Sequence, residues 1–130
     1  MKRFWIMAVL LFVFLGGTRA VSAQEEATFN PLRAEKDIEV GLFYLKKKNY
    51  DAAIERFKDA ILNKPNFARA HLLLGETYEK KGDKKEAVSW YQKYLEILPT
   101  ADNVPDIKKR LKRLNKEIEQ EAARRKRRSG

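Results

Sequence analysis

The chain contains no cysteine, a single histidine and only six glycines, and each shortage removes a class of chemistry. Without cysteine there is no disulfide, no thiol nucleophile and no lipid-bearing cysteine at a mature N-terminus. The one histidine, His71, cannot build a zinc site alone, and Ser89 lacks the glycine-framed turn that exposes a serine nucleophile. The glycines are too scattered to form a phosphate-binding loop. We therefore expect no enzymatic activity, no cofactor and no metal.

A long apolar run occurs at the N-terminus. Two basic residues precede the run Phe4–Leu15, and small residues at Val21-Ser22-Ala23 stand before Gln24. This order is typical of a secretory signal peptide. Twelve apolar residues would span about 18 Å as a helix, less than a hydrocarbon core of roughly 30 Å. We expect residues 1–23 to be cleaved and the chain to be periplasmic or secreted. A retained anchor is the alternative.

The formal charge of +10 is unevenly distributed along the chain. From Gln24 to Val104 basic and acidic residues are equal in number, whereas the segment after Pro105 is strongly basic. It ends in the run Arg124, Arg125, Lys126, Arg127, Arg128. Contact of this run with anionic membrane lipids or envelope polymers is one interpretation, and a solvated, disordered end is the other. No aromatic residue follows Tyr94, which argues against nucleic acid as a partner.

The most informative pattern is a 34-residue unit that occurs twice, starting at Ala34 and at Ala68. Equivalent positions hold the same or similar residues, which we assign to repeat packing: Gly41 and Gly75, Tyr44 and Tyr78, Ala53 and Ala87, Phe57 and Tyr91, Pro65 and Pro99. This period, with small residues at fixed offsets and a closing proline, resembles the tetratricopeptide repeat family. The resemblance implies an all-α fold of two helix-turn-helix repeats, an α-solenoid fragment that binds other proteins.

Turn residues and changes in composition divide the chain into further segments. We expect a polar leader over residues 24–33, repeats over 34–67 and 68–101, a capping helix over 102–123 and a basic tail over 124–130. The first repeat should turn at Lys46–Asn49 before a second helix, Tyr50–Asn63. The capping helix carries one narrow apolar stripe: Ile107, Leu111, Leu114 and Ile118. Because three repeats are usually needed for stability, this helix or self-association must supply further burial.

By the same resemblance, the first helix of each repeat lines a groove that binds a partner. The groove residues would be Ile38, Leu42, Leu45, Arg69, Leu72, Glu76 and Glu79. The subclass that clamps a peptide carboxylate uses Lys and Asn at such positions, and this chain does not. The mixture of apolar and charged residues suits an amphipathic helix or an extended apolar segment. The alternative is that the apolar positions contact the chain's own leader, at Phe29, or a second copy.

Tyr94 and Trp90 depart from the repeat's packing pattern, whereas His71 occupies a position where the first helix of a repeat usually places a large packing side chain. Tyr94 replaces a small residue, which suggests a wider gap filled by the C-terminal helix. His71 is expected to pack in the core, and Trp90 to pack between helices or to make an exposed contact.

Residues 40–57 are also similar to the BamD-like outer-membrane assembly lipoproteins, which are periplasmic scaffolds, although this chain lacks their lipid-bearing cysteine. We expect an exported scaffold or adaptor for another protein in the bacterial periplasm or cell envelope, with outer-membrane assembly as the role this resemblance implies. The alternative function is binding of anionic surfaces through the basic tail.

Overall fold

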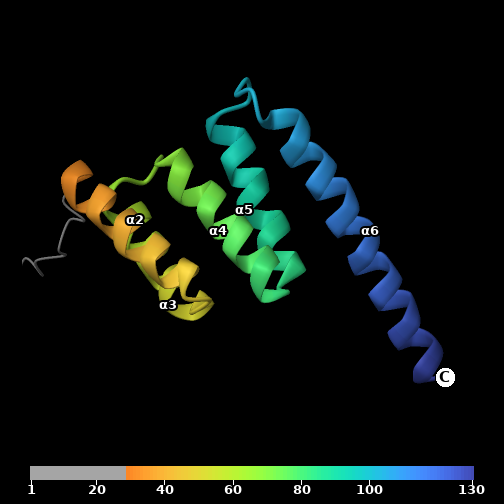
Figure 1. Ribbon diagram of the computed structural model, residues 1–130. Coiled ribbons are helices and arrows are strands. Elements are labelled where there is room, and N and C mark those ends of the chain that lie inside the picture. The colour runs from red at the N-terminus through yellow and green to blue at the C-terminus, as the bar shows by residue number, and fades with distance from the viewer. Residues whose placement is uncertain (1–28) are drawn as a thin grey trace, which may run out of the picture.

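The computed structural model describes residues 29–130, which form five helices (Figure 1). They are α2 (Pro31–Lys46), α3 (Tyr50–Asn63), α4 (Ala68–Lys81), α5 (Lys84–Ile97) and α6 (Val104–Arg128). Helices α2 and α3 form one pair, α4 and α5 a second, and α6 packs against α5. The expected all-α fold of two helix-turn-helix repeats followed by a capping helix is confirmed for this part of the chain. The predicted signal peptide, residues 1–23, lies outside the described residues.

Local side chains fix where the helices begin and end. Asn30 caps α2, and its Oδ1 accepts a 3.0 Å hydrogen bond from the backbone N–H three residues on, while Pro31 occupies the first helical position. Asn49 caps α3 in the same way, at 3.3 Å. Gly82 ends α4 with a φ of 91°, a left-handed conformation that favours glycine. None of the helices in residues 29–130 combines the length and apolar character needed to cross a membrane.

Each helix pair is held together by a ring lying on a glycine. The ring of Phe57 lies so close to Gly41 that an added Cβ would overlap it. In the second repeat, a Cβ on Gly75 would come within 2.6 Å of Cδ1 of Tyr91. Phe57 and Tyr91 are both fully buried. The glycines therefore allow the helices of a pair to approach closely enough to enclose these rings.

The other positions assigned to repeat packing divide between core and turns. Fully buried are Ala53 and Ala87; Tyr78 is buried and Tyr44 half-buried. Pro65 and Pro99 are exposed, because each lies in the turn that follows the second helix of its repeat.

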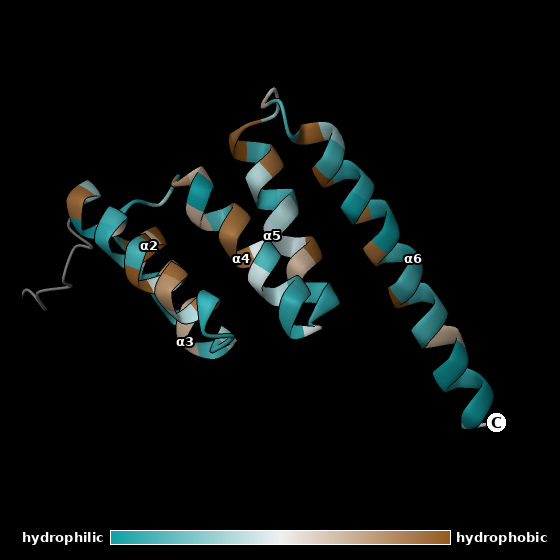
Figure 2. Cartoon of the chain, viewed as in Figure 1, coloured by the Kyte–Doolittle hydropathy of each residue, from teal (hydrophilic) through white to brown (hydrophobic). Residues whose placement is uncertain are grey.

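Helix α6 covers the second repeat with its apolar stripe, which faces α5 (Figure 2). Ile107 and Leu114 are buried, Leu111 and Ile118 are partly buried, and every residue from 119 onward is exposed. Lysines occupy exposed positions of α6 that lie 34 residues after buried positions of α4: Lys108, Lys109 and Lys112, after Leu74, Gly75 and Tyr78. A polar outer surface of this kind is what a terminal helix of a repeat array presents to water.

The interpretation of the basic tail as a disordered end is wrong. Helix α6 continues without a break through Arg124 and ends at Arg128, so the boundary expected at residue 123 does not exist. Arg and Lys are good helix formers, and positive charge is favourable at a helix C-terminus. Five consecutive basic residues therefore extend the helix instead of ending it.

The gap expected beside Tyr94 is occupied by its own ring and closed by the start of α6. Tyr94 is 4% exposed, and its hydroxyl donates a 2.7 Å hydrogen bond to Oδ1 of Asn103, the residue before α6. The Asn103 side chain makes no capping bond to the helix backbone. Instead it anchors the beginning of α6 to α5.

Candidate protein-binding face

The first helices of the two repeats and α6 are neighbours joined by charged side chains. Between α2 and α4, Nη1 of Arg69 lies 3.7 Å from a carboxylate oxygen of Glu35. Between α4 and α6, Glu79 pairs with two arginines of α6. We call the surface these helices form the α2–α4–α6 face. It comprises Glu35, Leu42, Leu45, Arg69, Leu72, Glu76, Glu79, Lys80, Arg110 and Arg113.

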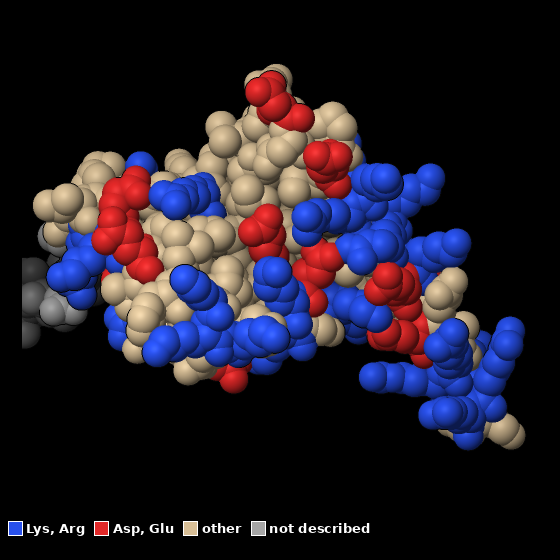
Figure 3. Space-filling view, in the orientation of Figure 1, with Lys and Arg blue, Asp and Glu red and all other residues tan. Residues whose placement is uncertain are grey.

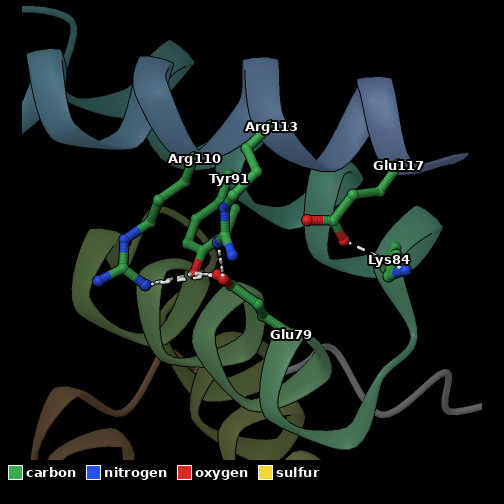
Figure 4. A network of polar contacts seen from close by, with 6 residues as sticks. All are labelled: Glu79, Lys84, Tyr91, Arg110, Arg113 and Glu117. Carbon is green, nitrogen blue, oxygen red and sulfur yellow. Dashed lines mark hydrogen bonds and ion pairs between the residues drawn. The ribbon is translucent and has the colours of Figure 1, made fainter.

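Glu79 is the centre of the polar network in this face (Figure 4). Its Oε2 accepts hydrogen bonds from the hydroxyl of Tyr91 at 2.6 Å and from Nη1 of Arg110 at 3.4 Å. Its Oε1 accepts one from Nη2 of Arg113. The glutamate thus ties α4 to both α5 and α6.

The network changes the ionisation of its members. Burial alone would raise the pKa of Glu79, but the hydrogen bonds from Tyr91 and Arg113, together with the charges of Arg113 and Arg110, lower it below its usual value. Burial, followed by the hydrogen bond to Glu79 and its negative charge, raises the pKa of Tyr91. The carboxylate therefore remains the charged acceptor of the network, and the phenol remains a donor to it.

Two predicted groove residues are less open than expected. Ile38 is fully buried, because it shares one stripe of α2 with the buried residues Ala34 and Gly41. The prediction that Ile38 lines the groove is wrong. The side chain of Glu79 is only 18% exposed, and its carboxylate already accepts three hydrogen bonds. Glu79 does lie on the face, as expected, but its carboxylate is engaged within the protein.

The remaining predicted residues lie on the face and are partly open. Leu42, Leu45 and Leu72 pack against the core with one side and are not fully buried. Glu76 is partly buried, and the side chain of Arg69 is 56% exposed. The face therefore presents an apolar strip between α2 and α4, with charges of both signs beside it.

A shallow pocket lies at the α6 side of the strip. Its volume is about 310 Å³, and its walls are Glu76, Glu79, Lys80 and Arg110. The sequence prediction missed the contribution of α6 to the face. The signal was present, because Arg110 and Arg113 follow Glu76 and Glu79 by one further period of 34 residues.

His71 and Trp90 serve packing. His71 is 7% exposed, with Nδ1 3.0 Å from the carbonyl oxygen of Phe67. The centroid of the Trp90 ring lies 5.6 Å from the centroid of the His71 ring. Nζ of Lys93 also contacts the Trp90 ring, 4.1 Å from its centroid. Within residues 29–130 no group of three or more His, Cys, Asp or Glu side chains is arranged to hold a metal ion.

Comparison with known proteins agrees with the class that the helix pairs define. Residues 41–102 match the family described as tetratricopeptide repeat. The chain is 31% identical over 62 residues to a probable UDP-N-acetylglucosamine–peptide N-acetylglucosaminyltransferase, SEC, of Arabidopsis thaliana. It is 29% identical over 77 residues to Hsp70-Hsp90 organizing protein 3 of the same organism. These matches cover 48% and 59% of this chain but only 6% and 14% of the two relatives.

Sequence match and fold together identify the two helix pairs as tetratricopeptide repeats. Repeats of this kind present extended surfaces that bind other proteins or peptides. The described part of the chain therefore contains two tetratricopeptide repeats followed by α6.

Proposed function

We propose that the protein is a non-enzymatic adaptor that binds one partner protein through the α2–α4–α6 face. The observation that carries this proposal is the composition of the face, where partly exposed leucines adjoin charged side chains. Leu42, Leu45 and Leu72 offer an apolar strip, and Arg69 and Glu76 adjoin it. Binding surfaces commonly combine an apolar centre with a polar rim.

The same face suggests the kind of segment that it takes. An amphipathic helix or a short extended apolar segment would place its apolar side chains on the leucines. Its polar side chains would meet Arg69, Glu76 and Lys80. The Tyr91–Glu79–arginine network supports this role, because it fixes α6 beside α4 before any partner arrives. A surface that is ordered in advance loses less conformational entropy on binding.

The place of action follows from the N-terminal pattern. We propose that the signal-like segment 1–23 directs the chain to the periplasm or cell envelope of a bacterium. Outer-membrane protein assembly is the process that we propose on the similarity of residues 40–57 to the BamD-like scaffolds. Self-association through the same leucines is the competing use of the face.

Position-specific photocrosslinking tests the proposal. A photoreactive phenylalanine analogue replaces Leu45 or Glu76 on the face, and in a matched control it replaces Gln92, which is exposed on α5. We expect a discrete crosslinked product from the two face positions in living cells and none from Gln92. Equal products from all three positions would contradict the proposal. A product of exactly two copies of this chain would replace the external partner by self-association.

A further inference from the structure

One end of the molecule collects basic side chains from four helices and the turns between them. Helices α2, α4 and α6 run in the same direction, so their C-terminal ends lie at one end of the molecule (Figure 1). Lys and Arg gather along this lower edge in Figure 3. We call these residues the basic edge: Lys46, Lys47 and Lys48 at the end of α2 and in the turn that follows; Lys80, Lys81, Lys84 and Lys85 around the α4–α5 turn; and Arg124, Arg125, Lys126, Arg127 and Arg128 at the end of α6.

Most of these charges are not neutralised within the protein. Nζ of Lys81 lies 2.7 Å from a carboxylate oxygen of Asp51. Lys84 pairs with Glu117 at 3.2 Å and with Glu121. The other ten residues of the basic edge form no ion pair within residues 29–130. The edge therefore carries a large uncompensated positive charge.

Folding alone does not account for this concentration. A cation near a helix C-terminus is favourable, which explains one or two lysines at the end of each helix. Further cations of the same sign repel one another when they are gathered in one place. Asp83 is the acidic residue of the α4–α5 turn itself, and it leaves the excess large. Binding of an anionic partner would relieve the repulsion between these cations.

We propose that the basic edge docks the protein on an anionic lipid bilayer. The cations come from the C-terminal ends of α2, α4 and α6 and from the N-terminal end of α5. These ends are spread along one edge, which matches an extended sheet of lipid phosphates. The five residues Arg124–Arg128 point to all sides of α6, since successive helical residues are separated by about 100°. Such a helix end makes diffuse contact with many anionic headgroups, each basic residue near the surface raising the partition coefficient about fivefold.

The edge is less suited to nucleic acid. Binding of a single strand needs a series of aromatic platforms, and the aromatic side chain exposed near this edge is Phe43, 54% exposed, with Nζ of Lys47 4.6 Å from its ring centre. One aromatic ring beside lysines fits the headgroup region of a bilayer, where amphipathic contacts of this kind are favoured.

Vesicle binding of two charge-matched variants tests the proposal. The protein is isolated from cells that express the full chain, and its partition coefficient is measured on phosphatidylglycerol–phosphatidylcholine vesicles and on phosphatidylcholine vesicles. The edge variant carries K46Q, K47Q, K48N and K85Q; asparagine is chosen at Lys48 because its φ of 59° is left-handed. The control variant loses the same charge at the opposite end of the molecule: R33Q, K36Q, K108Q and K109Q.

We expect the wild type to prefer the anionic vesicles, and the preference to disappear at high salt. The edge variant should lose binding to the anionic vesicles by about 20-fold or more, and the control variant by about threefold or less. Unchanged helicity by circular dichroism keeps the comparison valid. The single change K85Q, expected to weaken binding about fivefold, repeats the test if the fourfold variant misfolds.

Three results would overturn the proposal. Equal losses in the edge and control variants would mean that net charge acts without a defined edge. Full loss on deleting residues 124–130, with unchanged binding of the edge variant, would restrict the activity to the end of α6. Tighter binding to a duplex DNA oligonucleotide than to anionic vesicles, lost in the edge variant, would make the edge a nucleic-acid site.

Discussion

Tyr91 spans one full turn of α4, with its ring against Gly75 and its hydroxyl 2.6 Å from Oε2 of Glu79. In the first repeat, Phe57 lies against Gly41 in the same way, and Leu45 occupies the position equivalent to Glu79. The two repeats thus differ by a paired exchange at these two positions. The second repeat has both the tyrosine hydroxyl and the carboxylate that accepts its hydrogen bond, and the first repeat has neither.

This exchange predicts that two reciprocal substitutions each destabilise the protein, for different reasons. Tyr91→Phe removes one hydrogen bond while Glu79 keeps its arginines, and we expect a loss of about 0.5–1.5 kcal/mol in the free energy of unfolding. Phe57→Tyr would bury a hydroxyl beside Leu45 without an acceptor from that residue, costing about 1–3 kcal/mol. Urea unfolding measures both. A more stable Phe57→Tyr variant would show that the first repeat has an acceptor for the hydroxyl.

The lowered pKa of Glu79 predicts a pH-dependent contribution to stability. A carboxyl whose pKa is lower in the folded state stabilises the fold above its unfolded pKa of about 4.3, and loses that effect as the pH falls through the folded value. The difference in unfolding free energy between wild type and Glu79→Gln should therefore be largest above about pH 5 and shrink below about pH 4. If the difference stays constant across this range, the ionisation of Glu79 does not contribute to the stability of the fold.

The close packing of the helix pairs is tested by two neighbouring alanines. Ala53 is fully buried and Ala52 is partly exposed. Ala53→Leu should destabilise the protein by about 1–3 kcal/mol, because added bulk overpacks the α2–α3 pair. Ala52→Leu should cost less than half as much. Melting temperatures that fall equally in both variants would be incompatible with the packing described.

Export makes a chemical prediction about the N-terminus. If residues 1–23 are a cleaved signal peptide, the protein isolated from the cell envelope or medium begins at Gln24. Intact-mass spectrometry measures this directly. A mass that includes Met1 would indicate retention of the apolar segment as an anchor.

The repeat period in the sequence located most of the fold. Asn49 and Gly82 act through local geometry, so residue type and spacing were enough to predict the turns and the helix Tyr50–Asn63. The end of α6 was predicted wrongly because a run of basic residues is typical of a solvated, disordered end. No residue of this run breaks a helix.

The binding face was harder to derive because outward and inward positions alternate within one helical turn. Ile38 and Leu42 are both apolar and four residues apart, yet Ile38 is fully buried and Leu42 is partly open. Only the packing of neighbouring helices decides between them. The hydrogen bonds of Glu79 could not be predicted for the same reason, since its partners lie on α5 and on α6.

The exposed lysines of α6 decide how this array can grow. A helix packed on α6 as α5 packs on α4 would have to bury Lys108, Lys109 and Lys112, where α4 offers a leucine, a glycine and a tyrosine. Burying three unpaired ammonium groups is prohibitively unfavourable. A repeat added by gene duplication or by design is therefore tolerated between the existing units, in steps of 34 residues, and is rejected at α6 until those three side chains are replaced.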